Sequence, residues 1–156
     1  MFDSILSDGK KAAFFALLVI IVLVLIHFRG PIGLLSLIPL GTGALAMIGL
    51  MYIIGEKYNY MNLMAVPVIL GIGIDDGIHA LHRFRNEKGK GIDRIYNSFS
   101  FVGRAIFLTS VTTMIGFGSI AFYTMEGMAS FGRALMMGVG ACFLATVLLT
   151  LIEQLF

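Results

Sequence analysis

The chain has 156 residues and a formal net charge of +2, and 58% of its residues are hydrophobic whereas 13% are charged. A soluble domain carries about 25% charged residues, so this composition excludes an ordinary soluble domain and indicates an integral membrane protein. A single cysteine, Cys142, excludes an intrachain disulfide. The slight basic excess requires no nucleic-acid partner, because Lys and Arg commonly flank membrane helices.

Long apolar segments predict an all-α integral membrane fold with five transmembrane helices. The five segments cover residues 12–28, 31–54, 61–81, 101–125 and 131–152. Each can cross a hydrocarbon core of about 30 Å at about 1.5 Å per residue, so we expect one transmembrane domain over the whole chain. The first two connections are short, which predicts antiparallel neighbours. In the longer third connection, apolar residues at helical spacing predict a short amphipathic helix over 92–100.

Basic residues are distributed unevenly between the two ends of these segments. One end holds Arg29, Arg83, Arg85, Lys88, Lys90, Arg94 and Arg104, and the other holds Lys10, Lys11, Lys57 and Arg133. The positive-inside rule therefore predicts a multi-pass protein of the plasma (inner) membrane, with the long connection and the C-terminus in the cytoplasm. The N-terminus is then outside, which we interpret as the trace of an extracytoplasmic domain that precedes this chain in a longer protein.

Two adjacent acids, Asp75 and Asp76, interrupt the third segment in the stretch LGIGIDDGIHALHR. A charged Asp near the bilayer centre costs roughly 2.5–3.5 kcal/mol on insertion scales. The helix could end early and leave the acids among the lipid headgroups, or the acids could lie inside the membrane. The apolar pattern continues past them and the basic run begins only at His82 and Arg83, which favours the second interpretation.

An acid pair inside the membrane is suited to carry protons. Burial favours the neutral form of a carboxyl group, and an adjacent carboxylate adds to this effect, so we predict that Asp75 and Asp76 titrate as a coupled proton relay. His79, four residues after Asp75, either extends the relay or is an ordinary polar residue near the membrane edge. Three small residues in the same stretch would allow close helix approach: Gly71, Gly73 and Gly77.

The fourth segment supplies hydroxyl groups at a similar depth. Thr109, Thr112 and Thr113, together with Ser110, are about as far from Arg104 as Asp75 is from Arg83. These hydroxyls either bond to their own backbone or a neighbouring helix, or they support the acids directly. The matched depths predict that the third and fourth segments are antiparallel neighbours that bring the threonines to the acids.

Three stretches carry a resemblance to a known family. GIGIDDGIHALHRFRNE resembles the acidic helix of a half-transporter in the resistance–nodulation–division (RND) superfamily, in the style of its MMPL or hopanoid-transporter branch. GRAIFLTSVTTMIGFGS resembles the next helix of that family, and MNLMAVPVILGIGID resembles the lead-in to the acidic helix. The resemblance implies that the chain is the last five helices of one half, in style more like the C-terminal half. It matches Asp75 to the proton-relay acid, whereas at position 76 the lipid-exporting branch usually has Tyr and the multidrug branch has Asp.

The resemblance implies a function as well as a fold. It predicts the membrane domain of an exporter of lipids or other hydrophobic compounds that is driven by the proton motive force, and not an enzyme. No cofactor or metal is expected. The expected partners are the other half of the transporter or a homo-oligomer, membrane lipids, and a hydrophobic substrate that reaches the domain through a missing extracytoplasmic domain. Two alternatives stay open: a SecDF-like protein-export subunit, and a non-transporting membrane scaffold that resembles sterol-sensing domains.

Overall fold

Every regular element is a helix in the computed structural model, which describes residues 2–28, 31–57, 59–86 and 103–155. The elements are α1 (Phe2–Phe28), the 3₁₀ helix η1 (Pro31–Ser36), α2 (Leu37–Ile54), α3 (Tyr60–Asn86), α5 (Arg104–Ile120) and α6 (Glu126–Leu155). Within these described residues, four helices are long and apolar enough to cross a membrane, and α5 is a shorter apolar helix. The predicted all-α membrane fold is thus confirmed, while the amphipathic helix expected over 92–100 lies outside the described residues.

Two helix boundaries differ from those expected. Helix α1 begins at Phe2 rather than at residue 12, because Lys10 and Lys11 are polar but are good helix formers and continue the helix. Helix α5 has 17 residues and ends at Ile120 rather than at residue 125. At about 1.5 Å per residue it is about 26 Å long, shorter than a hydrocarbon core. Its last carbonyls accept hydrogen bonds from the turn that follows, including Tyr123 N–H to Ile120 O at 3.0 Å.

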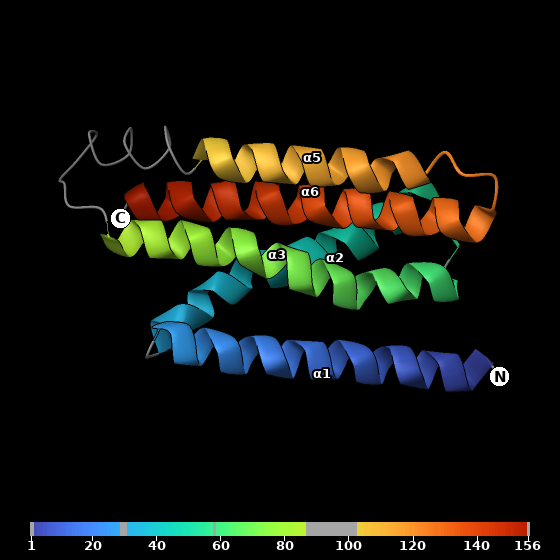
Figure 1. The fold of residues 1–156 in the computed structure, drawn as a ribbon, viewed down its shortest axis with the longest axis horizontal. Coiled ribbons are helices and arrows are strands. Elements are labelled where there is room, and N and C mark those ends of the chain that lie inside the picture. The colour runs from blue at the N-terminus through green and yellow to red at the C-terminus, as the bar shows by residue number, and fades with distance from the viewer. Residues whose placement is uncertain (1, 29–30, 58, 87–102, 156) are drawn as a thin grey trace.

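The helices form a row with one helix crossing it. In Figure 1, α1, α3, α6 and α5 lie side by side in that order, and α2 crosses behind α3 and α6. Helix α6 packs against α2, α3 and α5, and α3 packs against α1, α2, η1 and α6. The N- and C-termini lie at opposite ends of the bundle (Figure 1), as an odd number of crossings requires.

Two predicted neighbour pairs are present: α1 packs on η1, which begins the second predicted segment, and α2 packs on α3. The third differs, because α5 packs mainly on α6 and not on α3. Helix α1 packs on α3 and η1, because η1 leads the chain away and α2 then crosses to α6. Helix α5 packs along α6, which lies between α5 and α3, so the described parts of α3 and α5 touch little. Short connections and matched depths fix direction and level along the membrane, but they do not say which of several nearby helices a given helix contacts.

Small residues set the crossing of α2 and α3 over α6. Cys142 is buried where the three helices meet. A Cβ atom built on Gly43 of α2 would lie 2.2 Å from Cys142 Sγ and 2.8 Å from its backbone N, and one built on Gly73 of α3 would lie 2.7 Å from the same sulfur. Such distances leave no room for a side chain, so glycine is required for this close approach.

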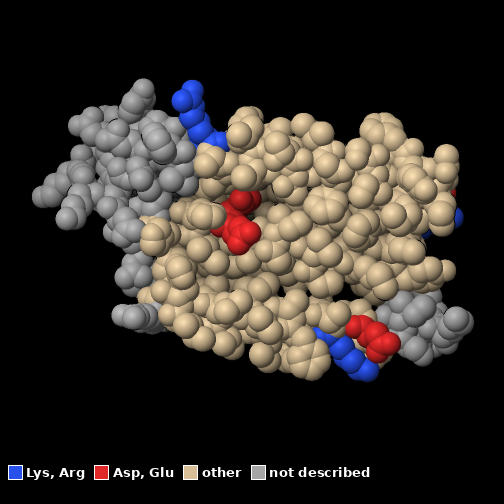
Figure 2. Space-filling model, in the orientation of Figure 1, with Lys and Arg blue, Asp and Glu red and all other residues tan. Residues whose placement is uncertain are grey.

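The outer surface of the bundle is apolar, as a surface in contact with lipid must be. Large exposed side chains include Leu45 of α2 and Ile115 of α5, at 71% and 67% exposure. Figure 2 shows that most of one face carries no charge, apart from the ends of the bundle and one small acidic patch within the apolar surface. That patch leads to the candidate site.

Candidate functional site

The acid pair lies inside a continuous helix. Helix α3 runs from Tyr60 to Asn86, and its candidate membrane span, Tyr60–His82, contains both Asp75 and Asp76. The interpretation in which the helix ends at the acids therefore does not hold, because helical residues follow for more than two turns after Asp76. Neighbouring positions on a helix point about 100° apart, so the two carboxylates face different surroundings.

Asp76 points into the bundle. Its residue is 8% exposed, and Ser110 of α5, which is 3% exposed, donates a hydrogen bond from Oγ to Asp76 Oδ2 at 3.2 Å. The bond crosses from α3 to α5 past α6, at a place where these two helices otherwise touch little. A hydroxyl that donates to a carboxylate favours its ionised form and compensates part of its removal from water.

Asp75 points out of the bundle. It is exposed on the lateral surface of α3, and His79, one turn further along, is exposed as well. Gly71, one turn before Asp75, is also exposed, and a Cβ atom built there would meet nothing within 4 Å. Gly71, Asp75 and His79 thus form an exposed stripe on α3, and an exposed carboxylate within a membrane span is costly against lipid.

The glycines near the acids also differ in whether they face the bundle or its surface. Gly73 faces Cys142, and a Cβ atom on Gly77 would lie 2.5 Å from the backbone oxygen of Ser36 in η1. Both therefore allow close packing of α3 against its neighbours, whereas Gly71 makes no such approach to the described residues. Helix η1 therefore contacts α3 at Gly77, the residue that follows the buried Asp76.

The structure does not bring Thr109 and Thr112 to the acids. Thr109 Oγ1 donates to the carbonyls of Ala105 and Ile106, Thr112 Oγ1 donates to those of Leu108 and Thr109, and both residues are exposed. Thr113 is half-buried. The two exposed hydroxyls thus follow the simpler alternative, bonding within their own helix.

Ser110 makes the contact instead, and helical periodicity was the signal that could have identified it. The buried positions of α5 are Ile106, Ser110 and Gly118, spaced by four and eight residues along one face. Thr109 and Thr112 lie off this face. A count of hydroxyl groups at the right depth is therefore less informative than their angular position on the helix.

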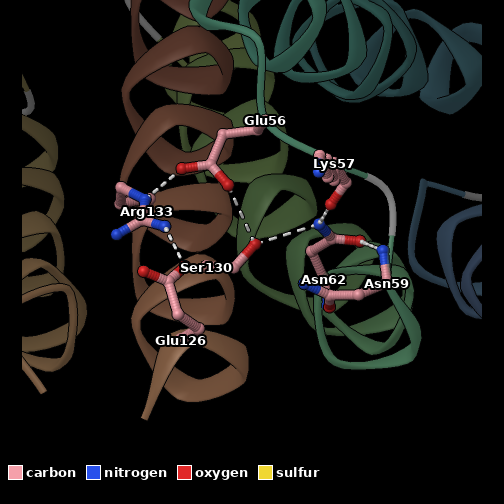
Figure 3. Close-up of polar contacts among 7 residues, drawn as sticks. All are labelled: Glu56, Lys57, Asn59, Asn62, Glu126, Ser130 and Arg133. Atoms are coloured by element: carbon pink, nitrogen blue, oxygen red, sulfur yellow. Dashed lines mark hydrogen bonds and ion pairs between the residues drawn. The ribbon is translucent and has the colours of Figure 1, made fainter. Parts of the chain in front are cut away.

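A second polar cluster, which sequence reasoning missed, closes the opposite end of the bundle (Figure 3). Glu56, just after α2, pairs through Oε1 with Arg133 Nε of α6, and Ser130 Oγ donates to Glu56 Oε2 at 3.2 Å. Asn62 of α3 donates from Nδ2 to Ser130 Oγ at 3.0 Å and to the backbone oxygen of Lys57 at 3.0 Å. We call Glu56, Asn62, Ser130 and Arg133 the end clamp.

The end clamp fastens the connection between α2 and α3 to α6. Asn59 and Asn62 also cap α3 reciprocally, since each side-chain oxygen accepts the backbone N–H of the other residue at 2.9–3.0 Å. The Glu56 side chain is 13% exposed, so its pair with Arg133 is shielded, whereas Glu126, 3.9 Å from Arg133 Nη2, is 98% exposed. Capping by Asn at a helix start is readable from sequence, but the Glu56–Arg133 pair joins residues 77 positions apart and is not.

At the other end of α1 and α3, two histidines meet. The ring centroids of His27 and His82 are 6.0 Å apart. Within the described part of the chain, no three or more His, Cys, Asp or Glu side chains are grouped closely enough to hold a metal ion.

The fold and the site together define a class: a multi-pass helical membrane protein with a carboxylate pair inside its spans. A family model, the sterol-sensing domain of SREBP cleavage-activation, matches residues 25–151. That match covers more than half of the chain, and the chain belongs to this family.

Known proteins confirm the resemblance to the hopanoid-transporter branch of the RND superfamily. The membrane protein MJ1562 of Methanocaldococcus jannaschii is 31% identical over 99% of this chain. The hopanoid transporter HpnN of Rhodopseudomonas palustris is 29% identical over 85% of the chain, and HpnN of Burkholderia multivorans is 24% identical over 93% of it. The chain spans 41% of the first relative and 15% and 16% of the two transporters. No solved structure matches.

Proposed function

We propose that the chain is the membrane domain of an RND-type exporter of lipids or other hydrophobic compounds, driven by the proton motive force through Asp75 and Asp76. The observation that carries the proposal is the carboxylate pair inside α3, with one acid buried against Ser110 and the other exposed within the span. The likeness to two proteins named as hopanoid transporters supports the lipid class of substrate.

The two acids have different parts in this mechanism. Asp75 takes up a proton at the surface of α3 and transfers it to Asp76, so that Asp75 is ionised again and Asp76 becomes neutral where it contacts α5. One charge that moves through 100 mV supplies about 2.3 kcal/mol. Protonation removes the penalty of a charge in the membrane and so allows α3 to change its neighbours.

The exposed stripe of Gly71, Asp75 and His79 is where a second body joins this bundle. Its partner is either the other half of the transporter or a second copy of the chain, and a hydroxyl or basic side chain there would satisfy Asp75. The substrate is handled by an extracytoplasmic domain outside this chain. Gly71 allows the partner helix to approach closely beside the acid.

The test is transport by the complete protein in proteoliposomes, with a fluorescent sterol analogue as the probe. We expect movement of the probe to require an imposed pH gradient and to stop when a protonophore collapses the gradient. Movement that follows a sodium gradient instead would contradict proton coupling.

A second function is favoured by one observation, the match of residues 25–151 to the sterol-sensing family. In that function the bundle binds a polycyclic lipid and responds to it without transporting it. Binding of the same fluorescent probe with no gradient-driven movement would favour this function over export.

The orientation of the domain in the inner membrane is a further part of the proposal. Because basic residues are denser at the end that holds Arg104, we place this end in the cytoplasm and the end that holds Lys57 outside. Cysteines introduced at these two exposed positions can be labelled with an impermeant maleimide in intact cells, since Cys142 is buried. Labelling is expected at position 57 and not at 104, and the reverse pattern would invert the topology.

A further inference from the structure

We propose that Ser110 is a positioning residue that fastens the first half of α5 to Asp76, and that this hydrogen bond is a latch which opens when Asp76 is protonated. The inference rests on the proposed function in one respect, that Asp76 changes its protonation state within the membrane. It assigns to α5 the movement that such a change produces.

Helix α5 packs on α6 along its length and is joined to α3 by one hydrogen bond in its first half. Its C-terminal end is held closely to α6: a Cβ atom built on Gly132 would lie 2.8 Å from Phe117 O and 2.7 Å from Ala121 N, and a short turn leads from there into α6. Along the rest of its length α5 lies at the edge of the row on α6 (Figure 1), where the ring centroids of Phe107 and Phe143 are 5.9 Å apart. Many of its side chains are exposed, and its described contact with α3 is the Asp76–Ser110 bond. This geometry is that of a lever with its pivot near Ile120.

The Asp76–Ser110 bond joins α5 to α3 at a point distant from the proposed pivot at Ile120. Ser110 precedes Ile120 by ten residues, about 15 Å along the helix. The hydroxyls of Thr109, Thr112 and Ser119 donate to carbonyls of α5 itself, whereas Ser110 donates to another helix. The link that can change with charge is therefore at Ser110.

Protonation changes the strength of this link. A hydrogen bond to an ionised carboxylate is roughly twice as strong as one between neutral groups, so a neutral Asp76 holds Ser110 less firmly. Among the described side chains, the titratable or charged groups near Asp76 and at the same end of the elements around it lie on four helices. They are Asp75, His79 and His82 on α3, Cys142 on α6, Arg104 at the start of α5, and His27 of α1. The described residues of η1 and the adjoining half of α2 carry no charged side chain.

The latch can be tested by a distance measurement that needs no transport. Spin labels are placed at Leu108 of α5 and Leu23 of α1, both exposed, in the whole chain with Cys142→Ala, and the distance is measured by double electron–electron resonance at pH 8 and pH 5 in lipid nanodiscs. We expect a narrow distribution at pH 8 and a longer, broader one at pH 5. A second pair, Ile115 and Leu23, should change less because Ile115 is nearer to the pivot.

Variants separate the latch from a merely structural role of Ser110. Ser110→Ala should give the pH 5 distribution at both pH values, Ser110→Thr should restore the pH response, and Asp76→Asn should remove it. A pH response that persists in Ser110→Ala, or no response in the unaltered chain, would overturn the latch. If Ser110→Ala does not fold, the Asp76→Asn comparison decides alone. Gradient-driven export without any change in distance would leave the proposed function standing and the latch refuted.

Discussion

Asp75→Asn is expected to abolish gradient-driven export by the complete transporter, down to the level seen with a protonophore. The amide keeps the size and shape of the side chain but cannot take up or release a proton. Because a charged Asp in a membrane costs roughly 2.5–3.5 kcal/mol, the variant should insert and fold at least as well as the unaltered protein. Export of the fluorescent sterol analogue, normalised to the amount of folded protein in the membrane, measures the effect.

Two control variants test whether the loss of export is specific to the ionisable group of Asp75. Asp75→Glu keeps an ionisable group on the exposed stripe and should retain part of the export. Thr112→Val removes a hydroxyl that donates within its own helix, and should leave export nearly unchanged. Unaltered export in Asp75→Asn would show that the proton relay does not depend on this carboxylate.

The hydropathy of the sequence was sufficient to predict an all-α membrane fold. The apolar segments in the sequence correspond to α1, η1 with α2, α3, α5 and α6, because a chain that crosses lipid must satisfy its backbone hydrogen bonds inside each segment. Helix ends were less predictable. The apolar segment begins after Lys10 and Lys11, but a helix can continue beyond the hydrocarbon core, and the helix propensity of lysine does not end it.

Which residues of different helices contact each other could not be predicted from the sequence. The acid pair could be singled out because two carboxylates in an apolar run are costly, but which of them is buried depends on the rotation of α3 about its axis. That rotation is set by Gly73 against Cys142 and by Gly77 against η1, contacts between residues far apart in the chain. The end clamp was missed for the same reason: Glu56 and Arg133 each look like ordinary polar residues at a membrane edge until the fold brings them together.

The largest effect on stability is expected at the crossing of α2 and α6. Gly43→Ala should destabilise the bundle by about 1–3 kcal/mol, the usual range for overpacking, because the new methyl group would overlap both the sulfur and the backbone of Cys142. An alanine in a helix interior is otherwise favourable by about 1 kcal/mol relative to glycine, so the steric effect must exceed this gain. Equilibrium unfolding in mixed micelles, followed by circular dichroism, would measure the difference.

The same helix offers the matched control. Gly41, two residues before Gly43, is exposed, and a Cβ atom built there meets nothing within 4 Å, so Gly41→Ala should be neutral or stabilising. Cys142→Ala in the Gly43→Ala background should restore only part of the stability, since it removes the sulfur at 2.2 Å but leaves the backbone atoms at 2.8 Å. Equal stability of the Gly41 and Gly43 variants would mean that α2 and α6 do not cross this closely. The rotation of α3 that buries Asp76 would then lose its support, since Gly73 packs against the same cysteine.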